Sequence, residues 1–242
     1  CSSDLGEWTP WTGSMRFGVI PACSVGDRWR RRAVLRPASS GAQADPEPTM
    51  PTVLITGANR GIGLEFARQY AQAGWRVLAV CRNAGSADSL RAQIPDARIL
   101  TAELTQRSDL LALARDLADD SIDVLIANAG VMSSGPREQP LDVSDEAWLR
   151  DFQVNALAAL RLAAALMPQV ARSAQRKMIA VSSMLGSMAS NTSGGHYSYR
   201  ASKAALNAMW RSLAVDHPEI IAVSISPGLL RTDMTQIGRA HV

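Results

Sequence analysis

A tyrosine and a lysine stand four residues apart in the segment 199–203, which reads Tyr-Arg-Ala-Ser-Lys. In a helix, side chains at i and i+4 share one face, so the phenol of Tyr199 and the ammonium of Lys203 would be neighbours. A neighbouring cation stabilises phenolate, which makes the phenol a better proton donor to a carbonyl oxygen. Tyr197 has Ala201 at the matching position and therefore lacks such a partner.

A second run able to do chemistry is glycine-rich and reads Thr-Gly-Ala-Asn-Arg-Gly-Ile-Gly at 56–63. It follows the apolar stretch 53–56 and precedes a helical pattern at 64–73, which is the strand-turn-helix context of a dinucleotide phosphate site. Glycine lets the backbone turn tightly beside a pyrophosphate, while N–H groups and the positive helix end face the anion. The alternative is a tight turn without a ligand. The expected cofactor contacts are Gly57, Asn59, Arg60, Gly61, Ile62 and Gly63.

The choice of dinucleotide depends on the end of the next strand, 76–80, which is followed by Cys81-Arg82. An acidic residue near this point would bind the ribose 2′-hydroxyl of NAD, whereas arginine suits the 2′-phosphate of NADP. Arg82 and Arg60 therefore favour NADP(H), because guanidinium binds phosphate in a planar fork. The alternative is two solvated surface arginines. Lys203 together with the oxidised nicotinamide is then expected to lower the Tyr199 pKa from about 10.

Three further strands complete an alternating β/α pattern and end in small or polar residues. Segment 98–102 leads into Glu103-Leu104, 123–127 into Asn128-Ala129-Gly130, and 177–181 into Ser182-Ser183. We therefore predict a single-domain α/β fold, a Rossmann-type doubly wound parallel sheet, whose ligands bind at the carboxyl ends of the strands.

By these motifs the chain resembles the classical short-chain dehydrogenase/reductases over about residues 51–234. It is most similar to the C-factor-like carbonyl reductases in Gly-Ala-Asn-Arg-Gly-Ile-Gly, Cys-Arg-Asn, Asn-Thr-Ser-Gly-Gly and Tyr-Arg-Ala-Ser-Lys-Ala-Ala-Leu-Asn. The resemblance implies a catalytic tetrad of Asn155, Ser183, Tyr199 and Lys203, in which Asn155 sits in a helix and holds a water that relays protons through Lys203. It also implies nicotinamide contacts from Pro227, Gly228 and Thr232.

The chain departs from the family pattern at two positions. Ala127 stands where an asparagine usually precedes Asn128, and Glu103 stands where an aspartate usually flanks the adenine. The first change weakens only a structural contact, and the second is mild.

The function implied by the resemblance is NADPH-dependent reduction of a small aldehyde or ketone, with Tyr199 as the proton donor. One alternative is a dinucleotide-binding signalling or regulatory protein on the same fold, which needs the glycines but tolerates a lost tetrad. Another is a catalytically dead fragment, if the chain is cut short.

The two ends of the chain suggest that it contains non-native sequence. Cys1–Asp4 and the tail 237–242 can be encoded by one DNA sequence read on opposite strands, which resembles a sequencing adapter. We therefore expect 1–49 to be a non-native or disordered extension that packs no element on the core, 50–236 to be a truncated NADP-binding catalytic domain, and 237–242 to be adapter-like. The last strand and helix of the fold would then be missing, leaving 220–226 as an unpaired edge. An arginine-rich targeting peptide at 28–32 is the alternative for the head.

Composition excludes several other classes of function. The net charge of +3 is scattered, which argues against nucleic acid, and the apolar stretch 156–167 contains Arg161 and is too short to span a membrane. That stretch is expected to be buried or to join a homodimer through the helices bearing Asn155 and Tyr199. Cys81 reads as a core residue, the three histidines have no metal spacing, and a cytoplasmic location is expected.

Overall fold

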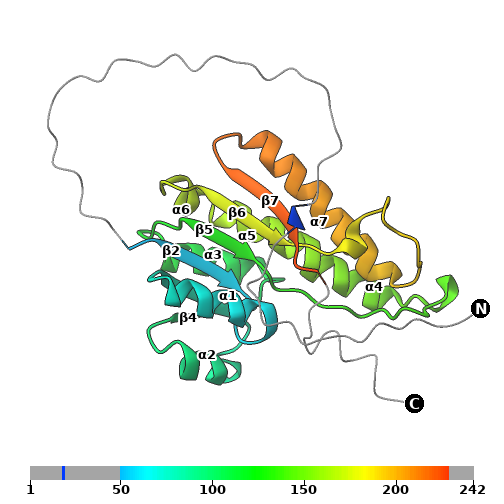
Figure 1. Ribbon diagram of the computed structural model, residues 1–242, viewed down its shortest axis with the longest axis horizontal. Helices are drawn as coiled ribbons and strands as arrows, with labels where there is room; N and C mark the ends of the chain where they lie inside the picture. The colour runs from blue at the N-terminus through cyan, green and yellow to red at the C-terminus, as the bar shows by residue number, and fades with distance from the viewer. Residues whose placement is uncertain (1–17, 20–49, 229–242) are drawn as a thin grey trace, which may run out of the picture.

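The computed structural model describes residues 18–19 and 50–228, which form a parallel β-sheet with helices on both faces (Figure 1). The elements in chain order are β1 Gly18–Val19, β2 Thr52–Thr56, α1 Gly61–Gln72, β3 Arg76–Cys81, α2 Asp88–Gln93, β4 Arg98–Thr101, α3 Arg107–Asp116, β5 Val124–Ala127, α4 Asp145–Phe152, α5 Ala158–Ala165, α6 Met167–Ala171, β6 Lys177–Val181, α7 Tyr197–Asp216 and β7 Ile221–Ser226. Short 3₁₀ turns lie at Ala84–Ser86, Pro140–Asp142 and Met184–Gly186, and a π-helical turn, η3, spans Gln153–Leu157.

The strand order is β1-β7-β6-β5-β2-β3-β4, and all strands from β2 to β7 pair in parallel. From β2 the chain winds outward to β3 and β4, and it then returns to β5 on the other side of β2. The order therefore reverses between β2 and β5, and open α/β sheets bind their ligands at such a switch point. The predicted Rossmann-type doubly wound sheet is confirmed.

Two apolar layers hold the sheet between its helices. Side chains alternate along β2, so Leu54 packs into the cluster with α3, α5 and α7, whereas Val53 and Ile55 pack into the cluster with α1 and α2. All five residues of β2 are buried, as expected of a strand that is covered on both faces. The observed register pairs Thr56 with Val80 of β3 and Ile55 with Ile126 of β5, so the ends of these strands lie together at one edge of the sheet.

The edge of the sheet beside β7 differs from the prediction. The two-residue strand β1 pairs antiparallel with it, Gly18 opposite Ser226 and Val19 opposite Ile225. The expectation that residues 1–49 pack no element on the core is therefore wrong for these two residues, and the edge is not wholly unpaired. An open strand edge offers N–H and C=O groups that any extended segment can bind. The pairing therefore cannot be predicted from a sequence pattern.

The rest of β7 still presents apolar side chains to solvent. Within the described part of the chain, Ile221–Ser224 have no strand on their outer side, and Ile221 and Val223 are 54% and 38% exposed. The expectations for 229–242, including Thr232 and the missing last strand, fall outside the described residues. No helix among the described residues is long and apolar enough to cross a membrane.

Candidate active site

The glycine-rich loop joins β2 to α1 at the switch point. Gly57 and Gly61 have φ values of +65° and +55°, a region that side chains other than hydrogen disfavour. A Cβ on Gly63 would lie 2.6 Å from Asn128 Nδ2 and closer still to the Gly57 carbonyl oxygen. Arg60, the residue directly before α1, has an extended backbone, and its side chain makes no capping hydrogen bond to the helix. A helix N-terminus of this kind can bind an anion through its backbone N–H groups.

Asn128 braces this loop from the end of β5. Its Nδ2 donates to the carbonyl oxygens of Thr56 at 2.9 Å and Gly57 at 3.3 Å, and its backbone N–H donates to Thr56 Oγ1 at 3.0 Å. Ala129 N–H donates to the same hydroxyl at 3.1 Å. The Asn128 side chain therefore holds the loop in place. A cofactor contact from the 128–130 segment would come from its backbone and small side chains.

The residues expected at the adenine and ribose side lie in the segments that follow β2, β3 and β4. Arg60 and Arg82 are both exposed, Arg82 directly after β3. The Glu103 carboxylate accepts hydrogen bonds from Thr105 N at 3.1 Å and Thr105 Oγ1 at 2.9 Å, so it closes its own turn. Leu104 packs against the core, and Ile62 packs against the cluster on the other face.

Tyr199 and Lys203 lie side by side on α7, as their spacing predicts. Both are buried, with 8% and 4% exposure, and Lys203 Nζ is 5.8 Å from the Tyr199 ring centroid. Lys203 Nζ also donates to the Val181 carbonyl at 2.8 Å, which ties α7 to the end of β6. Figure 1 shows α7 running alongside β6 and β7, so the pair is delivered to the carboxyl ends of the strands.

Ser183 completes the group at the end of β6. Its side chain hydrogen bonds to Tyr199, and its Oγ also accepts from Leu185 N at 3.2 Å. Ser182 is buried instead, and its Oγ has no hydrogen-bond partner in the described part of the chain. Of the two adjacent serines, Ser183 is therefore the one that the fold brings to Tyr199.

Asn155 lies in the π-helical turn between α4 and α5. Its Nδ2 donates to the Val131 carbonyl at 2.8 Å and to Ser202 Oγ at 2.9 Å, and its Oδ1 accepts from Val131 N at 2.8 Å. A Cβ on Gly130 would lie 3.1 Å from that Oδ1 and 3.5 Å from Lys203 Nζ. The Asn155 side chain therefore anchors the loop after β5 to α7, and π-turns of this kind are frequent at functional sites.

Burial dominates the pKa values of the pair in the protein without its cofactor. Burial raises the pKa of the Tyr199 phenol above 10; the hydrogen bond from Ser183 acts against this, and the carboxylate of Asp151 adds to it. Burial lowers the pKa of Lys203 to about 8, with Asp151 opposing the change. The protein's own groups therefore do not depress the Tyr199 pKa, because desolvation of the phenolate outweighs them.

Asp151 and Ser202 were not expected at the site. Asp151 is fully buried at 0% exposure, and Ser202 links Asn155 to α7. The one signal in the sequence is the spacing of Asp151 four residues before Asn155, which puts both on one helix face. Pro227 and Gly228 follow β7 and end the described chain, while Thr232 lies outside it.

Comparison with known proteins agrees with this geometry. The chain is 42% identical to C-signal of Myxococcus xanthus over 125 residues, 51% of this chain and 74% of that protein. It is similar to a protein of Burkholderia multivorans solved with bound NADP, at 31% identity and TM-score 0.68, covering 76% of this chain and 82% of the other. Carbonyl reductase Sniffer of D. melanogaster matches at 33% identity and TM-score 0.70, covering 76% and 83%.

The family model described as short chain dehydrogenase matches residues 51–241, which include the glycine loop, Asn155, Ser183 and the Tyr199–Lys203 pair. The chain therefore belongs to the classical short-chain dehydrogenase/reductase family of oxidoreductases.

Proposed function

We propose that this protein is an NADP(H)-dependent oxidoreductase that reduces a small aldehyde or ketone, with Tyr199 as the proton donor. One observation carries the proposal: Ser183, Tyr199 and Lys203 meet at the end of β6, on the same sheet edge as the glycine loop. The names of two similar structures support it, since one is a carbonyl reductase and the other was solved with NADP.

The residues present fit a dinucleotide. The space around Gly63 has no room for a side chain between α1 and the loop. Backbone N–H groups at the start of α1 can therefore approach a pyrophosphate closely. Arg60, directly before α1, and Arg82, directly after β3, are both exposed and can take a 2′-phosphate. NADPH bound here would supply the hydride that reduces the carbonyl carbon.

The side chains of this protein would supply the proton. The Tyr199 hydroxyl donates to the carbonyl oxygen as that oxygen gains negative charge, so the product is an alcohol and the phenol becomes phenolate. Ser183, which hydrogen bonds Tyr199, would hold the same oxygen. Lys203, with its pKa at about 8, is mainly protonated at neutral pH and stabilises the phenolate.

The test is oxidation of NADPH, followed by absorbance, with a panel of small aldehydes and ketones. Turnover by the wild type that is lost in Tyr199→Phe and kept in Tyr197→Phe supports the proposal. NADPH binding without turnover of any carbonyl would refute it and favour the regulatory alternative.

Two further expectations belong to the same proposal. We propose a homodimer through the helices that bear Asn155 and Tyr199. The helix α4, which leads into the turn of Asn155, exposes Leu149 and Trp148 at 57% and 37%. Light scattering at micromolar concentration tests it, and a monomer would contradict it. A cytoplasmic location is proposed as well, and cell fractionation tests it.

A further inference from the structure

A fully buried carboxylate lies beside the site without a part in the proposed chemistry. Asp151, in the last turn of α4, is 0% exposed. Its Oδ1 accepts from Ser133 Oγ at 2.7 Å and Ser133 N at 3.1 Å, and its Oδ2 accepts from Ser198 Oγ at 2.8 Å. Burying a carboxylate is costly unless it is hydrogen bonded, and these contacts provide that compensation.

Asp151 and Asn155 make two matching sets of hydrogen bonds, each of which ties the loop after β5 to α7. They stand four residues apart, and each holds one residue of the loop after β5: Asp151 holds Ser133 and Asn155 holds Val131. Each also holds a serine of α7, and these serines are again four residues apart, at 198 and 202.

Tyr199 and Lys203 are the residues that directly follow these two serines in the sequence. Tyr199 follows Ser198, and Lys203 follows Ser202. The first tie, which Asp151 makes, therefore acts on the turn of α7 that carries the phenol, and the second acts on the turn that carries the ammonium.

The charge of Asp151 also acts on both catalytic groups. Its negative field raises the pKa of Tyr199 and that of Lys203. Besides Tyr197, the charged or titratable side chains around the start of α7 are Glu138, His196 and Arg200. Each is hydrogen bonded to backbone: Glu138 accepts from Tyr197 N at 3.1 Å, His196 Nδ1 contacts the Ser134 carbonyl, and Arg200 donates to the Gly194 and Gly195 carbonyls.

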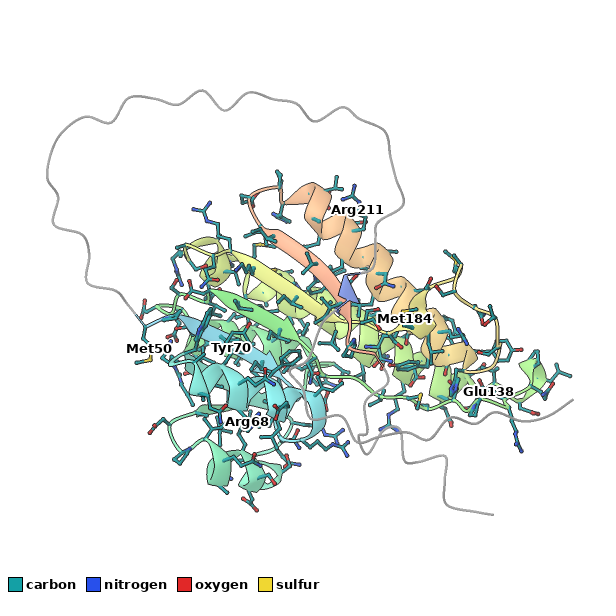
Figure 2. All side chains as sticks on the ribbon, in the orientation of Figure 1. Met50, Arg68, Tyr70, Glu138, Met184 and Arg211 are labelled. Atoms are coloured by element: carbon teal, nitrogen blue, oxygen red, sulfur yellow. The ribbon has the colours of Figure 1, made fainter. Side chains whose placement is uncertain are left out.

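Figure 2 shows the labelled Glu138 beside the start of α7. Asp151 is a charged side chain whose field acts on both members of the pair. From the neighbouring elements the site receives neutral groups, namely Asn155, Ser182, Ser183, Ser133 and Ser134.

We propose that Asp151 is a positioning residue that fixes the place and the protonation of the Tyr199–Lys203 pair through its ties to α7 and to the loop after β5. The inference rests on the proposed function, since it concerns the same phenol and ammonium. It assigns Asp151 no contact with substrate.

The central variant is Asp151→Asn, which keeps the shape and removes the charge. We expect kcat to fall on the order of tenfold, with the NADPH dissociation constant changed by less than about threefold. The alkaline limb of the pH profile for carbonyl reduction should move to lower pH by about half to one unit, because Lys203 and Tyr199 both lose their protons more easily without Asp151. Ser198→Ala should lower kcat without moving that limb, because it breaks the tie and keeps the charge.

Asp145→Asn is the matched control, because it removes the same charge from the same helix at an exposed position. It should behave as the wild type in kcat and in pH profile. A loss of kcat in Asp151→Asn with no movement of the alkaline limb would overturn the proposal and leave Asp151 with a structural role alone. Wild-type behaviour of Asp151→Asn would overturn it as well.

A readout without turnover separates this inference from the proposed function. The chain has three tyrosines, so an ultraviolet difference titration of tyrosinate, with Tyr199→Phe subtracted, isolates Tyr199. Its titration should move to lower pH in Asp151→Asn even if no carbonyl in the panel is reduced. Identical titration in wild type and variant refutes the inference, whereas absence of turnover alone refutes only the proposed function. Should Asp151→Asn fail to fold, Ser198→Ala decides: an unchanged kcat in that variant overturns the proposed tie.

Discussion

Replacing Gly63 by alanine tests the glycine loop directly. The new Cβ would lie 2.6 Å from Asn128 Nδ2 and nearer still to the carbonyl oxygen of Gly57, distances that real Cβ atoms do not show. Relief requires α1 and the loop to separate by about 1 Å, since carbon atoms need about 3.5 Å or more from their neighbours. Overpacking of this kind costs about 1–3 kcal/mol of unfolding free energy.

The displacement falls on the helix end that would face the pyrophosphate. We therefore expect Gly63→Ala to weaken NADPH binding at least about tenfold, because the N–H groups of α1 and the loop no longer converge. Denaturant unfolding measures the stability change, and fluorescence titration measures the NADPH dissociation constant.

Gly74→Ala is the matched control at the other end of the same helix. Gly74 has φ +78° and no atom within 4 Å of an added Cβ, so alanine there strains the backbone without touching the loop. It should cost about 1–2 kcal/mol and leave NADPH affinity unchanged. Wild-type affinity in Gly63→Ala, or an equal loss of affinity in Gly74→Ala, would refute the reasoning.

Three other predictions concern the cofactor, the proton donor and pH. NADPH should bind at least about tenfold more tightly than NADH, and alanine at Arg60 or Arg82 should reduce that ratio; dissociation constants that are equal in the wild type would contradict it. Tyr199→Phe should lower carbonyl reduction by about 10²–10⁴-fold with NADPH binding retained, whereas Tyr197→Phe should change little, and kcat with both variants decides. Lys203 has a folded pKa of about 8 against an ordinary 10.5, so the unfolded chain binds more protons between these values and stability should rise from pH 8 towards 10, by up to about 3 kcal/mol. Denaturant unfolding at both pH values measures it, and Lys203→Met should abolish the rise; a wild-type stability that falls over this window would contradict the burial of the ammonium.

Local sequence patterns alone determined much of the fold and the outline of the site. The apolar runs that end in Gly57, Asn128 and Ser183 are strands, because buried parallel strands are continuous in apolar residues. The Tyr199–Lys203 pairing followed from helical periodicity, which holds wherever the helix packs. Each of these features depends on residues close together in the chain.

Contacts between distant segments were decided by the tertiary structure. Asn128 turns its amide to the Thr56 carbonyl, 72 residues away, and Asp151 holds Ser198 across 47 residues. The pairing of Gly18 with Ser226 is likewise long-range and depends on an edge that only the assembled sheet presents. No local pattern encodes which polar group meets which, because the partners come together only after the core has packed.

The protonation of Tyr199 and Lys203 also depends partly on local sequence and partly on tertiary structure. Residue types predicted a cation beside a phenol, and the structure places Lys203 Nζ 5.8 Å from the Tyr199 ring. The direction of the Tyr199 pKa shift depended on burial, which is set by every element that covers the phenol. Spacing along the chain thus determined which groups are neighbours, while the depth of their burial, and so the cost of charging them, was decided only by the folded sheet and its helices.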